Sequence, residues 1–229
     1  MSSYGMAGRA ALVVAAALGL GACSAATSQP SEVQRLQARA AFERGLKHFS
    51  DREAPQALTA LQEAIALDRT SAVYRDTLGL VFTELQRPDL ATEQFRQAVE
   101  LDPQYADAHF HLGVALAEVA RWEEGAAAYR KALSLPTLTV PHFAHQNLGL
   151  ALYHLRQYRE AEEQLRFAIG LEPQMGLAYY NLGLVLAAQG RRGDARLAFS
   201  RARDLGPETP FGEAARERLR ALGEEGSHR

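Results

Sequence analysis

Four histidines come closest to a reactive or metal-binding arrangement in this sequence. His109 and His111 are two residues apart, and His142 and His145 are three apart. Two imidazoles one helical turn apart can bind a metal ion together. No carboxylate or cysteine nearby in the sequence completes either set, so packing or solvation is the favoured interpretation. No nucleophile–base pairing and no glycine-rich phosphate loop is present either. The sequence therefore predicts no enzyme activity and no metal or cofactor.

The single cysteine, Cys23, follows a segment with the layout of an export signal. Arg9 precedes an apolar run from Ala10 to about Leu20, which is too short for a transmembrane helix. The sequence Leu20-Gly21-Ala22-Cys23 resembles the lipobox of bacterial lipoproteins, in which the cysteine is acylated. We interpret residues 1–22 as a lipoprotein signal peptide and Cys23 as the lipidation site, the acyl chains being the only added group. The alternative is an ordinary signal peptide with an incidental cysteine.

The residues after Cys23 predict where such a protein would lie. Ser24, and not aspartate, follows the cysteine. By resemblance to the Gram-negative sorting rule, this implies the periplasmic face of the outer membrane, with a lipid anchor. Residues 24–31 are small and polar and read as a tether that reaches at most roughly 28 Å. Residues 23–37 thus comprise the acylated cysteine, the tether and the lead-in to a first helix.

The balance of acidic and basic residues limits the kinds of molecule that the protein can be expected to bind. The chain of 229 residues has 25 basic and 27 acidic side chains. Nucleic-acid binding favours a strongly basic face, so a nucleic-acid partner is excluded. No motif indicates a small-molecule substrate either.

A pattern of glycines, alanines and large apolar residues recurs along the chain. Gly45, Gly79, Gly113, Gly149 and Gly183 are separated by 34, 34, 36 and 34 residues. A small residue follows each glycine after 12 positions: Ala57, Ala91, Gly125, Ala161 and Ala195. A large apolar residue lies four further on, and an alanine three after that: Leu61, Phe95, Tyr129, Leu165 and Phe199; Ala64, Ala98, Ala132, Ala168 and Ala202. Small residues let two antiparallel helices approach closely, and Pro103, Pro173 and Pro207 close several repeats.

This pattern is that of the tetratricopeptide repeat (TPR). It predicts an all-α fold, a right-handed superhelical TPR solenoid of five helix pairs with a C-terminal capping helix. The repeats are expected at 38–71, 72–105, 106–141, 142–175 and 176–209. A polar capping helix is expected at 210–222 and a fraying tail at 223–229.

TPR arrays usually bind ligands on the concave side, along the first helix of each pair. By resemblance, this groove maps to the second, fifth, ninth and twelfth positions of each repeat. The apolar residues at those positions are Phe42, Leu46, Phe49, Val73, Leu80, Phe110, Val114, Phe143, Leu150, Tyr153, Leu177, Tyr180 and Leu184. Ordinary core packing explains the ninth-position aliphatics Leu46, Leu80, Val114, Leu150 and Leu184 equally well. Our hypothesis is that these groove residues take an apolar helix or strand of another protein, and full burial of Phe110 and Phe143 would refute it.

A carboxylate-clamp function is the weaker interpretation of the same groove. Asn147 and Asn181 lie at the sixth repeat position, where some TPR domains hold a C-terminal carboxylate. No lysine accompanies them on those helices, so the charge that such a clamp needs is missing.

The spacing of the third and fourth repeats carries a further resemblance. Two extra residues fall in an extended, proline-containing linker at 135–141. Thr137-Leu138, then Pro141, then Asn147-Leu148-Gly149 is similar to the lengthened connection of the type IV pilus pilotin family (PilF/PilW/Tgl type). That family typically has six repeats, whereas this chain has five and a capping helix.

The resemblance implies a function for the whole mature chain. Such lipoproteins bind the secretin subunit of the type IV pilus and promote its localisation to, or multimer assembly at, the outer membrane, a requirement for twitching or gliding motility. The alternative is a general envelope scaffold that docks peptidoglycan enzymes or another outer-membrane complex. Both predict protein–protein interaction through the groove.

Overall fold

The computed structural model describes residues 29–227, with side chains to residue 223. Cys23 and the segment interpreted as a signal peptide lie outside the described residues. The predicted all-α solenoid is confirmed. Within the described range there are eleven helices and no strand. None of these helices is long and apolar enough to cross a membrane.

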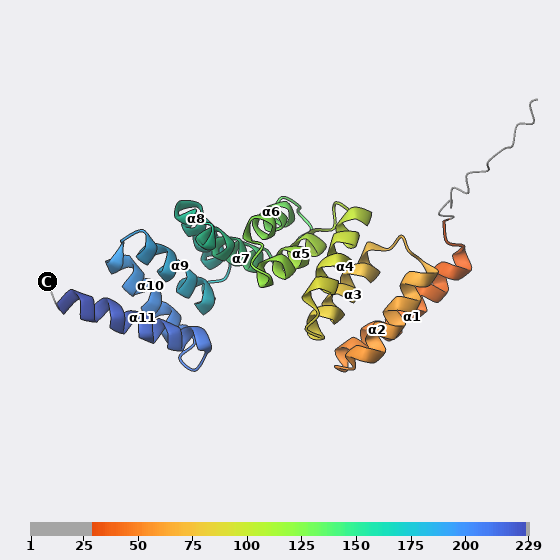
Figure 1. Ribbon diagram of the computed structural model, residues 1–229, viewed down its shortest axis with the longest axis horizontal. Helices are drawn as coiled ribbons and strands as arrows, with labels where there is room; N and C mark the ends of the chain where they lie inside the picture. Colours follow the sequence, from red (N-terminus) through yellow and green to blue (C-terminus); the bar gives the residue numbers. More distant parts are fainter. Residues whose placement is uncertain (1–28, 228–229) are drawn as a thin grey trace, which may run out of the picture.

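The helices follow one another in antiparallel pairs along the long axis of the molecule, from α1 at one end to α11 at the other (Figure 1). Each pair packs closely, and each second helix also contacts the first helix of the next pair. The helices are α1 (Glu32–Ser50), α2 (Ala54–Leu67), α3 (Ala72–Glu84), α4 (Pro88–Leu101), α5 (Ala106–Glu118), α6 (Trp122–Leu133), α7 (Pro141–His154), α8 (Tyr158–Leu171), α9 (Gly176–Ala188), α10 (Arg192–Leu205) and α11 (Pro210–Ser227).

The two ends of the array are more helical than the sequence predicts. Helix α1 begins six residues before position 38, because Ser31 and Gln34 form a capping box that starts it at Glu32. Helix α11 runs from Pro210 to Ser227, five residues beyond the capping helix expected at 210–222. No proline follows Pro210 to stop this helix.

The linker between the third and fourth repeats lies one residue earlier than predicted, with the same length. Residues 134–140 are not helical, and Pro141 is the first residue of α7. A fixed φ and a missing N–H suit proline to this first position. The linker is tied to the third repeat by Asp107, whose Oδ1 accepts hydrogen bonds from the Thr139 backbone N–H and hydroxyl at 3.0 Å each.

The recurring glycines mark the closest approach of the two helices in each pair. A Cβ at Gly149 would lie 2.6 Å from Cγ of Leu165. At Gly79 and Gly183 it would lie 2.5 Å from the rings of Phe95 and Phe199. These distances are far below van der Waals contact, so each large residue fills the space that a side chain at the glycine would need. The alanines at the second packing position, Ala57, Ala91, Ala161 and Ala195, are buried as well.

A second repeating element closes the first helix of every pair. The fifteenth position of each repeat has a positive φ: Arg52, Gln86, Ala120, Arg156 and Gly190. In the third repeat the Ala120 N–H donates to the Ala117 carbonyl, and the Arg121 N–H donates to Leu116 at 2.9 Å. These are the two hydrogen bonds of a Schellman motif. The same turn in every repeat sets the same entry angle for the second helix.

Ion pairs connect successive repeats on the outside of the array. The backbones of α4, α6, α8 and α10 do not approach one another within the described residues, and long side chains bridge them. Arg130 of α6 reaches Glu160 of α8 at 2.8 Å, and Arg96 of α4 reaches Glu124 of α6 at 3.4 Å. Because these pairs are exposed, each contributes little to stability.

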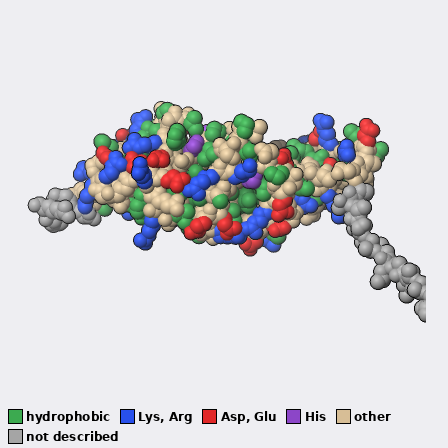
Figure 2. Space-filling view, turned by 90° about the horizontal axis from the view of Figure 1, so that it is seen from above, with side chains coloured by type: hydrophobic (Ala, Val, Ile, Leu, Met, Phe, Trp, Pro, Cys, Tyr) green, Lys and Arg blue, Asp and Glu red, His purple; other side chains and the backbone are tan. Residues whose placement is uncertain are grey.

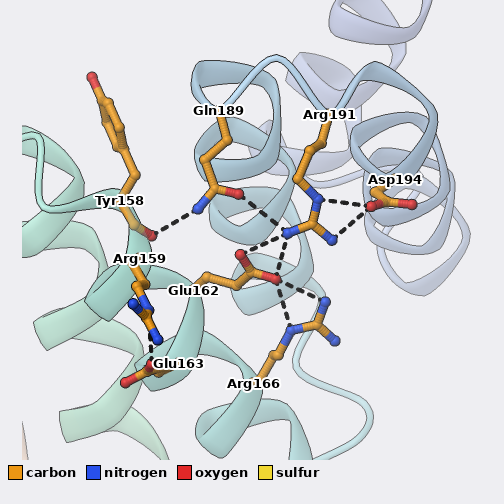
Figure 3. Close-up of polar contacts among 8 residues, drawn as sticks. All are labelled: Tyr158, Arg159, Glu162, Glu163, Arg166, Gln189, Arg191 and Asp194. Atoms are coloured by element: carbon orange, nitrogen blue, oxygen red, sulfur yellow. Dashed lines mark hydrogen bonds and ion pairs between the residues drawn. The ribbon is translucent and has the colours of Figure 1, made fainter.

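The fourth and fifth repeats share a denser polar cluster. Figure 3 shows Glu162 of α8 between the guanidinium groups of Arg166 and Arg191, at 2.9 and 2.8 Å. Arg191 also pairs with Asp194 of α10 at 2.6 Å. Although partial burial acts to raise it, the hydrogen bonds from Arg191 and Arg166 lower the pKa of Glu162 overall. The cluster joins α8 to the N-terminus of α10.

Candidate functional site

The first helices of the repeats form the inner row of the array. Consecutive members α1, α3, α5, α7 and α9 contact one another, whereas α2, α4, α6, α8 and α10 do not within residues 29–227. In a curved array the helices on the inside lie closer together than those on the outside. The positions predicted to line the groove therefore lie on helices of the inner row.

None of the groove residues is fully buried. Val73, Phe143 and Leu177, the second-position residues of three repeats, are 43%, 45% and 39% exposed. Leu46 is 40% exposed, and the remaining members are half-buried: Phe42, Phe49, Leu80, Phe110, Val114, Leu150, Tyr153, Tyr180 and Leu184. Phe110 and Phe143 thus both keep accessible surface, and the outcome that would have refuted the groove hypothesis is not observed.

The half-buried aromatic groove residues also pack on neighbouring rings. The rings of Phe42 and Tyr74 lie 4.7 Å apart between centroids, and those of Phe110 and Tyr129 lie 6.0 Å apart. Tyr153 lies 5.9 Å from Tyr158. One side of each ring is therefore held by the fold while part of it stays accessible. Rigid, partly exposed rings lose little conformational entropy when a partner covers them.

A pocket of about 230 Å³ opens in this surface between the third and fourth repeats. Two groove residues, Val114 and Leu150, form part of its wall. Its other lining residues are Ala117, Glu118, Trp122, Tyr129 and Asn147. It is smaller than the roughly 300–1,000 Å³ of typical small-molecule sites, so its size suits one side chain of a bound protein.

Sequence reasoning missed the polar residues at the fifth position of the second and fourth repeats, Asp76 and Gln146. Both are buried, at 3% exposure. Asp76 accepts a hydrogen bond from the Tyr105 hydroxyl at 3.2 Å, and its other oxygen lies 2.8 Å from Nδ1 of His111. Burial, followed by the nearby charge of Asp76, raises the pKa of Tyr105. Asp76 lies 29 and 35 residues away from these two partners in the sequence. The repeat frame places Asp76 at the same position as the groove residue Phe110, so an acidic residue at that position was the signal that could have indicated this network.

The histidines are held by packing and by protein acceptors. His109 Nε2 lies 3.1 Å from the Pro103 carbonyl oxygen, and burial lowers the pKa of His109. His145 Nδ1 lies 2.7 Å from Gln164 Oε1, and its ring stacks on Phe167. His142 lies against Phe143 at 4.3 Å. The part of the chain with described side chains contains no group of three potential metal ligands.

The two asparagines considered for a carboxylate clamp differ in accessibility. Asn147 is half-buried and accepts a hydrogen bond from Gln146 at 3.0 Å. Asn181 is only 3% exposed, and its Nδ2 has no hydrogen-bond partner among the described residues. A buried amide cannot reach a carboxylate on the groove surface, so the geometry does not support a clamp at Asn181.

The molecular surface has no region dominated by one sign of charge on the face drawn in Figure 2. Acidic and basic side chains are interspersed there around hydrophobic ones. This mixture agrees with the nearly balanced composition of the chain. Apolar contact, and not a broad electrostatic field, is therefore the larger source of binding energy that this surface offers.

Comparisons with known proteins agree with the repeat pattern. The family description "Tetratricopeptide repeat" matches residues 147–210, and "TPR repeat" matches residues 79–119. The chain is 30% identical over 184 residues to the type IV pilus assembly protein PilF of Pseudomonas aeruginosa, covering 76% of this chain and 72% of that protein. It is 38% identical over 106 residues, or 44% of the chain, to the protein O-mannosyl-transferase Tmtc1 of Drosophila melanogaster, but spans only 12% of that protein.

Solved structures share the fold. The crystal structure of PilW, described as a widely conserved type IV pilus biogenesis factor, has a TM-score of 0.69 at 23% identity, over 82% of this chain and 87% of that one. YrrB, described as a TPR protein with an unusual peptide-binding site, has a TM-score of 0.68 at 21% identity, over 79% and 92%. At these identities the likeness shows the fold alone.

Proposed function

The chain belongs to the family of TPR proteins that includes the type IV pilus assembly protein PilF, and from this membership we propose that it is a lipid-anchored scaffold for type IV pilus biogenesis. It binds the secretin subunit through the groove residues and promotes the localisation and multimer assembly of the secretin at the outer membrane. It acts by binding and not by catalysis, and it uses no cofactor.

The observation that carries the proposal is the partly exposed apolar row on the inner helices. Phe143 and Val73 keep more than two fifths of their surface accessible, although both are apolar. Such a surface is stabilised when another protein covers it. We propose that an unassembled secretin subunit supplies the apolar segment that covers this surface.

The anchor is the second part of the proposal. Acyl chains on Cys23 would hold the protein at the periplasmic face of the outer membrane. The described chain starts six residues after Cys23, at Gln29, so the array would stay close to the membrane. A secretin bound in the groove would then be retained at its site of assembly.

The test compares membrane extracts from cells with and without this protein on an unheated gel probed for secretin multimers. Loss of the multimer with the monomer still present supports the proposal. A normal multimer contradicts it. The protein would then be a general envelope scaffold, and its partners, such as peptidoglycan enzymes, would be recovered by pull-down with a Phe110→Asp variant as the control.

A further inference from the structure

A small residue lies in the wall of the pocket between the third and fourth repeats. Ala117 occupies the twelfth repeat position, as Ala187 does in the fifth repeat, whereas Phe49 and Tyr153 occupy it in the first and fourth. At the fourth repeat the tyrosine ring packs beside Tyr158, with ring centroids 5.9 Å apart. At the third repeat the pocket stays open, with a volume of about 230 Å³.

The walls of this pocket combine aromatic rings with one negative charge. Trp122 is half-buried, one face of its ring stacked on His154 with centroids 3.9 Å apart. Tyr129 forms the floor and is only 1% exposed. Glu118, the last residue of α5, is exposed, and no hydrogen bond or ion pair engages it among the described residues. Glu124 and Glu160 on the outer helices differ, because each of these two carboxylates is paired with an arginine.

We propose that this pocket holds an arginine side chain of the bound protein, its guanidinium against Trp122 and facing the Glu118 carboxylate. The inference rests on the proposed protein-binding function and names the chemistry of one anchor. Charge complementarity decides the occupant. A purely apolar side chain would remove water from Glu118 and supply no partner, which is unfavourable for a carboxylate. A guanidinium stacks on an indole and forms two hydrogen bonds with a carboxylate at once.

The surrounding groups agree with a single charged anchor. Burial, followed by the nearby charge of Glu118, raises the pKa of the Tyr129 phenol. Tyr129 therefore stays neutral, and Glu118 alone among the lining residues carries charge. Asn147 of α7 also lines the pocket, and its Oδ1 accepts a hydrogen bond from Gln146. The apolar wall of Val114 and Leu150 suits the aliphatic stem of an arginine.

The experiment uses the fluorescence of Trp122, the single tryptophan of the chain. The purified protein is titrated with a short acetylated peptide that has leucines around a central arginine, and with matched peptides that have citrulline or phenylalanine in the centre. Citrulline keeps the shape of arginine but lacks its charge. We expect a saturable change in Trp122 fluorescence with the arginine peptide, and a Kd about tenfold higher with citrulline.

Three variants make the assignment specific. Glu118→Gln should reduce the preference for arginine over citrulline to near unity. Glu84→Gln, the same change at the same position of the preceding repeat, should preserve that preference. Ala117→Tyr, which introduces the residue of the fourth repeat, should abolish the response while the melting temperature stays within a few degrees.

Several results would overturn the assignment. These are equal affinity for arginine and citrulline, tighter binding of the phenylalanine peptide, or no response to any peptide. The secretin-multimer assay tests the proposed function separately from the peptide titration. Loss of multimers without arginine selectivity would reject only the pocket assignment. Arginine selectivity with normal multimers would retain the pocket and reject the secretin role.

Discussion

Asp76 illustrates how this fold holds a single polar residue within an apolar row. Its carboxylate is buried between α3 and α5, and the Tyr105 hydroxyl and the His111 imidazole both contact it. A buried carboxylate with two partners is stable, whereas the loss of one partner leaves an unsatisfied acceptor. The network therefore links the second and third repeats, because the carboxylate comes from α3 and the imidazole that contacts it comes from α5.

The first prediction concerns this network. Tyr105→Phe removes the hydroxyl that donates to Asp76 and should lower the free energy of unfolding by about 1–3 kcal/mol. Urea denaturation measures the change. Tyr158→Phe is the matched control, because no hydrogen bond of its hydroxyl is seen among the described residues, and it should change stability by less than about 0.5 kcal/mol. Equal effects of the two variants would rule out a special contribution of Asp76.

The glycine contacts give the second prediction. Gly149→Leu places side-chain atoms where Leu165 already lies and should destabilise the fourth helix pair by about 1–3 kcal/mol or more. Gly170→Leu is its control, since no atom lies within 4 Å of a Cβ there and leucine favours helix more than glycine. Thermal unfolding should show a lower melting temperature for the first variant and an unchanged or higher one for the second. The opposite order would contradict the assigned packing.

The turn between the paired helices is the repeating element that the glycine pattern does not reveal. Four of the five turns place a residue other than glycine at positive φ, including Ala120 at 57°. This conformation costs an L-residue roughly 1–2 kcal/mol relative to the right-handed region. The Schellman hydrogen bonds and the packing on both sides hold the turn in place despite this cost.

Replacement of that alanine is the third prediction. Ala120→Gly should raise the free energy of unfolding by about 0.5–1 kcal/mol, because relief of the backbone strain exceeds the added entropy of the unfolded chain. Ala127→Gly, an exposed site inside α6, should lower stability by a similar amount. Chemical denaturation of both variants measures the difference. A lower stability for Ala120→Gly would mean that the turn is not strained.

The Glu162 cluster gives a prediction with a defined pH dependence. The lowered pKa of Glu162 means that its contribution to stability is present above the ordinary value of 4.5 and is lost as pH falls below it. Glu162→Gln should therefore lower the free energy of unfolding by about 1 kcal/mol at pH 7, discounted for solvent screening. The variant and the parent should become equal near pH 3. Melting temperatures across pH 3–8 measure this, and a constant difference would show that the charge is not responsible.

The whole molecule is an elongated array with an apolar inner row, and the proposed lipid anchor near its N-terminus would hold it at one membrane. Figure 1 shows the helix pairs leading away from the N-terminal end, so the C-terminal repeats lie farthest along the array from the proposed anchor. A partner bound along the inner row would extend in the same direction. Anchor and groove thus have separable tasks, location and binding.

The anchor prediction separates these tasks. Cys23→Ser, which removes the acylated thiol, should release the protein from the membrane fraction while its circular dichroism and melting temperature stay unchanged. Fractionation followed by immunoblotting measures the first effect. A variant that remains entirely in the membrane fraction would contradict the lipoprotein interpretation. Release accompanied by normal secretin multimers would mean that binding does not require the anchor.

The spacing of the repeats is sufficient to predict the architecture. Glycines such as Gly79 and Gly149, each followed after sixteen residues by Phe95 or Leu165, specify where helices touch, because only small residues allow that approach. Spacing is a local property, so the repeat frame and the inner row of Phe110 and Phe143 could be predicted. The helical extensions at both ends were missed, although their signals are local: Ser31 and Gln34 form a capping box, and no proline stops α11.

The buried polar contacts and the open pocket could not be predicted from the spacing, because both form between repeats. Asp76 and His111 are 35 residues apart, and the superhelical stacking of repeats brings them within 2.8 Å. The pocket at Ala117 likewise requires walls from α5, α6 and α7. An alanine looks the same in the sequence whether its neighbours close over it or leave a space. Contacts between repeats arise from the rotation between successive helix pairs, which local spacing does not specify.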